Sequence, residues 1–189
     1  MKGATKHVLI LLAVGALILF TNLGVPRLWD RDEPRNAGCA AEMIARGDWV
    51  VPWFNDELRT HKPVLLYWLM MAAYSLFGVN EFSARFGSAM LGLGTIVWTY
   101  AIGSRLFHAR VGLLAGIVLA STLMFDVAAR AATPDSSLIF FVTASVGAFV
   151  LGVFPGRETA GAGLLAKAGA KSQNASRESW YLDAEDWRL

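Results

Sequence analysis

Long runs without a charged residue constrain this chain more than any other feature. Four such runs cover residues 8–25, 86–104, 111–129 and 136–154, and only the third is interrupted by a charged residue, Asp126 near its far end. Each run is long enough to cross a hydrocarbon core of ~30 Å as a helix that rises 1.5 Å per residue. With 55% hydrophobic and 17% charged residues, the 189-residue chain is too apolar for an ordinary soluble domain. The sequence therefore predicts an all-α integral membrane protein with about four transmembrane helices.

The first run is either a membrane anchor or a secretory signal peptide. Lys2 and Lys6 precede it, and the segment TNLGVPR that ends it offers no small-x-small cleavage site. We therefore interpret it as an uncleaved anchor. Its positive flank predicts a cytoplasmic N-terminus.

A fifth apolar stretch, residues 63–78, complicates the number of spans. It is short for a span and carries Tyr67, Trp68 and Tyr74, which are residue types that favour the membrane interface. If it crossed the membrane, the cationic loop RLFHAR at residues 105–110 would face outside, against the positive-inside rule. We therefore interpret residues 63–78 as an interfacial or re-entrant helix on the outer face.

This topology places two acidic segments on the outer face of a cytoplasmic (inner) membrane. One is a cluster of opposed charges directly after the first run, with the sequence RLWDRDEPR, and the other is TPD at residues 133–135. A short outer-face helix is expected after Glu33, because Pro34 suits the first turn of a helix and Gly47 suits its end. Without further information the charge cluster is either a solvated, salt-bridged patch or an active site.

Composition excludes several classes of function and defines two regions. The single cysteine, Cys39, rules out an intrachain disulfide and a cysteine metal cluster, and no group of Lys and Arg residues predicts nucleic-acid binding. Residues 1–155 are expected to form the membrane domain. Residues 156–189 are polar and rich in Gly, Ala and Ser, which predicts a mobile cytoplasmic tail.

Several motifs occur in a fixed order between the first run and the last. They are the acidic pair of DRDE, the connector GDWVVP, a KP that precedes an apolar YW-containing helix, the segment LFGVNEFSARF, and a later PD. In this order they resemble the N-terminal region of the polyprenyl-phosphate-dependent GT-C glycosyltransferases, which include protein mannosyltransferases and lipid A aminoarabinose transferases. The resemblance covers roughly residues 10–150.

The resemblance implies a reaction and two acidic positions. Such enzymes take a sugar from a polyprenyl phosphate in the membrane and pass it to a lipid or protein acceptor on the outer face. The catalytic carboxylate of the first outer loop falls on Asp32, with Glu33 beside it, and the acid of the second outer loop falls on Asp135. A carboxylate in this position can accept the proton of the acceptor.

The same reaction needs cationic groups that hold the departing phosphate. Arg35, Lys62 and Arg85 are the candidates, since Arg binds phosphate in a bidentate manner and Lys acts as a point charge. Some relatives carry a metal-binding Glu where His61 stands here. His61 keeps a side chain that can bind a metal, so a divalent cation is an open expectation at this position.

Relatives of this kind have about ten or more spans, whereas four are expected here. The resemblance therefore implies a truncated GT-C architecture, which is a fragment, a truncated gene product or one half of a split enzyme. A non-catalytic membrane subunit or scaffold derived from such an enzyme is the main alternative. A transporter would place several ionisable residues inside its spans, and only Asp126 meets that condition. The sequence identifies neither the sugar nor the acceptor.

Overall fold

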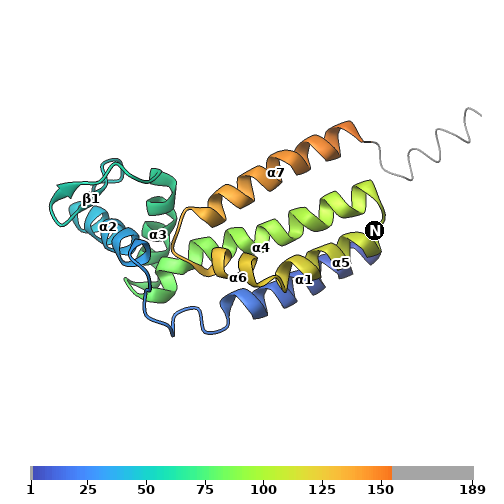
Figure 1. Cartoon of the computed structure of the whole chain (residues 1–189), viewed down its shortest axis with the longest axis horizontal. Coiled ribbons are helices and arrows are strands. Elements are labelled where there is room, and N and C mark those ends of the chain that lie inside the picture. Colours follow the sequence, from blue (N-terminus) through green and yellow to red (C-terminus); the bar gives the residue numbers. More distant parts are fainter. Residues whose placement is uncertain (1, 155–189) are drawn as a thin grey trace, which may run out of the picture.

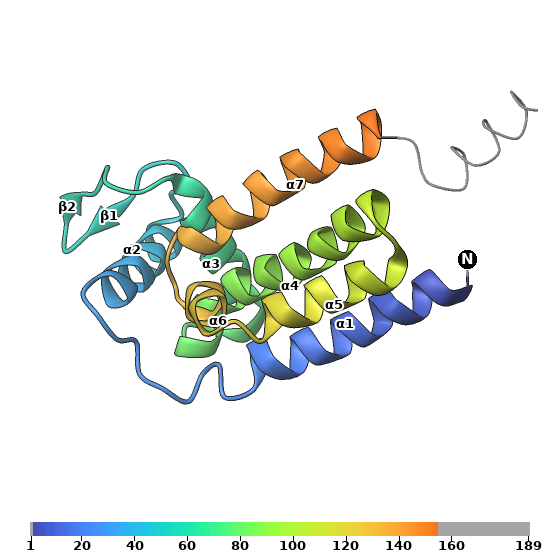
Figure 2. The same cartoon turned by 45° about the vertical axis from the view of Figure 1, so that its right-hand side comes forward.

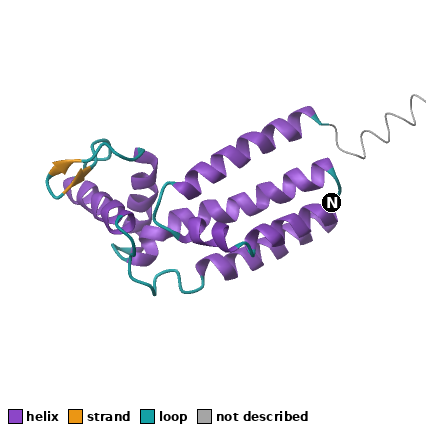
Figure 3. Ribbon diagram, in the orientation of Figure 1, coloured by secondary structure: helices purple, strands orange, loops and turns teal. Residues whose placement is uncertain are grey.

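The computed structural model describes residues 2–154, which are mostly helical (Figure 3). The described elements are α1 (Lys2–Phe20), α2 (Asp32–Arg46), β1 (Trp53–Phe54), β2 (Glu57–Leu58), α3 (Val64–Phe77), α4 (Glu81–Leu106), α5 (Ala109–Ala120), α6 (Leu123–Arg130) and α7 (Asp135–Val153). The all-α membrane fold is therefore confirmed, with one small antiparallel hairpin added. The predicted tail at residues 156–189 lies outside the described residues.

The apolar helices run lengthwise beside one another (Figures 1 and 2). Within residues 2–154, α1, α4 and α7 are long and apolar enough to cross a membrane, and α5 together with α6 would make a fourth span. The 26-residue helix α4 packs against α1, α5 and α7. Buried side chains of this bundle include Leu11, Leu19, Ile96 and Ala129. Helix α4 is thus the central element of the membrane layer.

The first span begins and ends earlier than predicted. Helix α1 starts at Lys2 and ends at Phe20, whereas the charge-free run covers residues 8–25. The helix ends because Asn22 has a φ of 56°, in the left-handed region that a right-handed helix cannot include. The remaining apolar residues of the run belong to the connection to α2.

The third predicted span, over residues 111–129, is not one continuous helix. The chain breaks after Ala120, and α5 and α6 meet at 68°. The Ser121 and Thr122 hydroxyls both donate to the Val118 carbonyl, at 3.0 and 2.8 Å, while Thr122 adopts an extended backbone. Such hydroxyl-to-backbone bonds compete with the helical ladder and favour a bend. The bend turns α6 away from the axis of α5.

Helices α4 and α5 approach each other closely at two glycines. A Cβ atom on Gly112 would lie 2.6 Å from the Tyr100 carbonyl oxygen and 2.8 Å from the Ser104 nitrogen. A Cβ on Gly103 would lie 2.9 Å from the Gly112 Cα. Small residues allow this backbone-to-backbone contact, which is typical of helix pairs in membranes.

Helices α2 and α3 form a cap with the hairpin at one end of the bundle (Figures 1 and 2). As predicted, α2 contains Pro34 in its first turn and ends at Gly47, whose φ is 67°. The buried face of α2 packs on α3, with Cys39 and Met43 against Tyr67 and Met70. Helix α3 has only 14 residues, too few to span ~30 Å at 1.5 Å per residue.

Candidate active site

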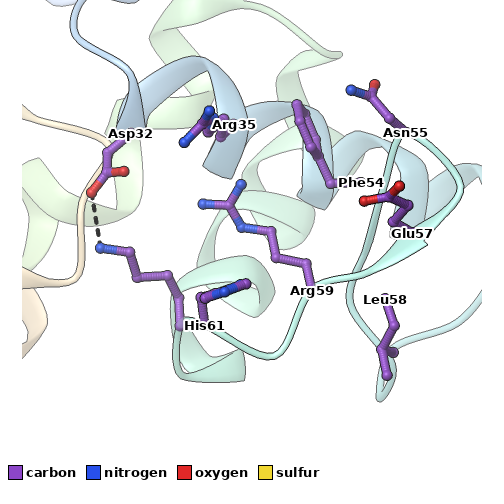
Figure 4. Close-up of a pocket in the computed structure, with 9 residues that line it drawn as sticks. Asp32, Arg35, Phe54, Asn55, Glu57, Leu58, Arg59 and His61 are labelled. Carbon is purple, nitrogen blue, oxygen red and sulfur yellow. Dashed lines mark hydrogen bonds and ion pairs between the residues drawn. The ribbon is translucent and has the colours of Figure 1, made fainter.

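A pocket of about 620 Å³ opens in the cap between α2, the hairpin and the segment that leads into α3 (Figure 4). Its walls are Asp32, Arg35, Phe54, Asn55, Glu57, Leu58, Arg59, His61 and Lys62. The hairpin brings the last four of these back toward α2. Its turn residues Asn55 and Asp56 have φ values of 54° and 60°, the combination that a two-residue type I′ turn requires.

Asp32 and Lys62 form the ion pair of the pocket. The Lys62 Nζ donates to Asp32 Oδ2 at 2.9 Å, and the two side chains are 26% and 44% exposed, respectively. The hydrogen bond from Lys62 lowers the pKa of Asp32, against the opposing effect of burial, and the charges of Lys62, Arg59 and Arg35 lower it further. The pocket therefore presents an ionised carboxylate to solvent, next to an ammonium group.

Arg59 is a pocket residue that the sequence analysis missed. Its Nη2 donates to Asn36 Oδ1 at 3.1 Å, and its guanidinium lies 5.5 Å from the centre of the Phe54 ring. In Figure 4 its head group lies near that of Arg35, between Asp32 and Phe54. No sequence motif identifies this arginine as a pocket residue, because it reaches the pocket only through the fold of the hairpin, which places it opposite α2. The pocket thus contains three basic side chains, Arg35, Arg59 and Lys62.

Glu33 and Arg85 lie elsewhere, although Glu33 follows Asp32 directly. They form a buried ion pair in which Arg85 Nη2 donates to Glu33 Oε2 at 2.7 Å and Arg85 Nε donates to Oε1 at 3.0 Å. The two residues are only 2% and 5% exposed, and neither lines the pocket around Asp32. The structure therefore does not bring them together with Asp32, Arg35 and Lys62.

Asp135 is the first residue of α7 and is exposed, and it accepts a hydrogen bond of 2.9 Å from the Thr133 hydroxyl. It lines a second, mainly apolar groove of about 400 Å³. The other lining residues are Pro63, Leu65, Leu66, Pro134, Ser137, Leu138 and Phe141. Since Pro63 follows Lys62 in the chain, this groove begins next to the Asp32–Lys62 pair.

A metal site at His61 was an expectation from the sequence. Within residues 2–154, no three His, Cys, Asp or Glu side chains are grouped so that they could hold a metal ion. His61 lines the pocket with Asp32 and Glu57 but without such a ligand set. The described residues do not fit a metal centre, and any ion at His61 would need ligands from outside this segment.

Comparisons with known proteins point to one family. Residues 61–170 match the family described as dolichyl-phosphate-mannose-protein mannosyltransferase. The undecaprenyl phosphate-alpha-4-amino-4-deoxy-L-arabinose arabinosyl transferase of Enterobacter sp. (strain 638) is 32% identical over 156 residues, which are 80% of this chain and 28% of that protein. The corresponding transferase of Shewanella sediminis (strain HAW-EB3) is 33% identical over 127 residues, or 67% of this chain and 23% of the relative.

A solved structure is also similar. The crystal structure of ArnT from Cupriavidus metallidurans bound to undecaprenyl phosphate superimposes with a TM-score of 0.74 at 32% identity, over 80% of this chain and 28% of that one. The chain thus spans less than a third of the length of these relatives. The family match, the relatives and the shared fold lead to one conclusion: this chain belongs to the dolichyl-phosphate-mannose-protein mannosyltransferase family of GT-C membrane glycosyltransferases.

Proposed function

We propose that this chain provides the reaction pocket for transfer of a sugar from a polyprenyl phosphate to an acceptor at the outer face of the cytoplasmic membrane. The observation that carries the proposal is the half-buried Asp32–Lys62 pair of the polar pocket, because the residue after Lys62, Pro63, lines the apolar groove. A polyprenyl phosphate has the same two-part chemistry, a phosphate and an apolar chain. The similar ArnT structure contains undecaprenyl phosphate, which supports this class of donor.

The reaction displaces the lipid phosphate from the anomeric carbon of the sugar. As an acceptor hydroxyl attacks that carbon, Asp32 takes its proton, and the bond to the phosphate breaks. Lys62 and Arg35 stabilise the negative charge that returns to the phosphate oxygens. The apolar groove, with Leu65, Leu138 and Phe141 among its walls, takes the first units of the prenyl chain. Asp135 lies in the same groove and shapes its polar end.

A chimera tests this proposal. Residues 1–154 would replace the matching segment of ArnT from Cupriavidus metallidurans, and release of free lipid phosphate would be measured with a polyprenyl-phosphate sugar. We expect the chimera to be active and Lys62→Met to raise the KM for the donor about 10- to 100-fold, the value of a hydrogen bond to a charged group. Lys6→Met, which removes a lysine from α1, is the matched control and should leave the KM unchanged.

Lys62→Met is also expected to change the pH dependence of kcat/KM. Lys62 holds the pKa of Asp32 below 3.8, so its loss lets that pKa rise. A base with a raised pKa is protonated at higher pH, and the acid limb of the kcat/KM profile should therefore move to higher pH in Lys62→Met. An unchanged donor KM together with an unchanged acid limb would contradict the proposal. An inactive chimera would favour the non-catalytic subunit instead.

The orientation of the chain follows from the cationic loop between α4 and α5. We propose that this loop faces the cytoplasm and that the cap of α2, the hairpin and α3 faces outside, as the positive-inside rule favours. Cysteines at Val79, which is exposed before α4, and at Ala109 should then differ in a Cys39→Ala background. We expect an impermeant thiol reagent to label the first in intact cells and the second only after permeabilisation. Equal labelling at both positions would exclude this orientation.

A further inference from the structure

Two side chains of α2 bind both backbone polar groups of Ala132, a residue in the turn between α6 and α7. The Ala132 N–H donates to Glu33 Oε1 at 2.7 Å, and the Ala132 carbonyl accepts from Asn36 Nδ2 at 2.9 Å. Ala132 and Asn36 are both 0% exposed. Glu33 and Asn36 lie three residues apart on α2, where side chains share one face of a helix. The turn is therefore fixed to α2 at two points.

The ion pair behind this contact has every polar position filled. The two Glu33 oxygens accept four hydrogen bonds, from Arg85 Nε and Nη2 and from the backbone N–H groups of Ala132 and Trp29. Arg85 donates five, two to Glu33 and one each to the carbonyls of Leu23, Pro26 and Arg27. A carboxylate and a guanidinium offer about four and five such positions, respectively. Neither group has a lone pair or a proton left for a substrate.

This arrangement also agrees with the charge state of Glu33. Burial by itself would raise the pKa of Glu33, but the hydrogen bonds from Arg85, Ala132 and Trp29 outweigh burial and lower it. The carboxylate is thus ionised and fully bonded. A catalytic acid or base would instead need an oxygen that a substrate can reach.

We propose that Glu33, Asn36 and Arg85 are positioning residues that hold the Asp135 turn at a fixed place relative to Asp32. We call them the Ala132 clamp. Glu33 of the clamp is next to Asp32 in α2. Ala132, the residue that the clamp binds, is three residues before Asp135, the first residue of α7. A second bond supports the fixed end of α7, since the Ser136 hydroxyl donates to the Ser88 carbonyl of α4 at 2.7 Å. The catalytic consequence rests on the proposed function, whereas the clamp itself does not.

The clamp also reaches the wall of the pocket. Asn36 Oδ1 accepts from Arg59 Nη2, so one amide joins Arg59 to the Ala132 carbonyl. Asn36→Ala removes both bonds without changing any charge. It is therefore the variant that loosens the turn while the Glu33–Arg85 pair stays intact.

Distance measurements on the full chain test the clamp. Spin labels at Ala45, exposed in the last turn of α2, and at Leu138, exposed in the first turn of α7, would report how the two helices sit relative to each other, in a Cys39→Ala background. We expect one narrow distance distribution for the otherwise unchanged chain and a broad one for both Asn36→Ala and Glu33→Gln. Glu81→Gln, a neutralised acid at the start of α4, is the control and should keep the narrow distribution. Narrow distributions in both clamp variants would overturn the proposal.

Stability and kinetics complete the test. Glu33→Gln leaves the buried Arg85 charge without a neutralising carboxylate, and we expect its thermal midpoint to fall by about 10 °C. In the active chimera, Asn36→Ala should lower kcat and leave the donor KM unchanged, a split that a general loss of folded protein would not produce. An unchanged kcat would remove the positioning role. The distance measurements involve no sugar transfer, so they stand or fall separately from the proposed function.

Discussion

Asp32→Asn in the active chimera is expected to lower kcat for sugar transfer by at least about 100-fold, the usual contribution of a positioned general base. Asparagine keeps the shape of the side chain but cannot take a proton from the acceptor. The effect on folding should be small, because the Asp32 side chain is 44% exposed and its partner Lys62 can turn to water. Initial rates of lipid phosphate release, with folded protein measured by size-exclusion chromatography, check both statements.

Asp30→Asn is the matched control for this variant. Asp30 lies two residues earlier in the same charge cluster, is exposed, and accepts a hydrogen bond of 2.7 Å from the Arg31 N–H. Its φ of 62° is a conformation that asparagine tolerates. We expect near-normal transfer. Equal losses in the two variants would mean that the cluster acts through its overall charge and not through Asp32.

Gly112→Leu is expected to prevent the chain from folding. A side chain at this position would meet the Tyr100 carbonyl oxygen and the Ser104 nitrogen, both backbone atoms of α4 that cannot turn aside. Extra methylene groups in a packed core lower the free energy of unfolding by about 1–3 kcal/mol even where side chains can shift. Here α4 and α5 themselves would have to separate. We expect aggregated or degraded protein when detergent extracts are analysed by size-exclusion chromatography.

A glycine with open space around it serves as the control. Gly152 lies in the last turn of α7, and a Cβ there would meet nothing within 4 Å. Gly152→Leu should therefore extract and elute like the unchanged chain. If Gly112→Leu did the same, the close contact between α4 and α5 would not exist in the membrane.

The sequence predicted the elements whose causes are local. Absence of charge marks an apolar helix wherever it occurs, and Pro34 and Gly47 start and stop α2 by their own backbone preferences. The break after Ala120 was missed because Ser and Thr also occur inside continuous helices. Whether their hydroxyls bend the chain depends on how α6 packs against its neighbours.

The site was predictable only in part, for a similar reason. Asp32 and Glu33 are neighbours in the sequence, but successive residues of a helix point about 100° apart, so one faces the pocket and the other faces the interior. Which of them is buried depends on Arg85, 52 residues further on. From the sequence alone both acids are catalytic candidates, because composition does not distinguish the two faces of α2. Arg59 carried no local signal at all.

Helix α4 is longer than the hydrocarbon core of a typical bilayer is thick. Its 26 residues extend ~39 Å, whereas the hydrocarbon core is ~30 Å thick, so an upright α4 would project roughly 9 Å beyond it. Arg85 is the fifth residue of α4 and binds Glu33 of α2, so it attaches the cap to this end of the helix. A thicker bilayer would draw this end toward the hydrocarbon, and a thinner one would lift it away from the lipid head groups. In the orientation proposed above, the thickness of the surrounding membrane therefore changes how far the cap, with Asp32 and Lys62, lies from the lipid head groups.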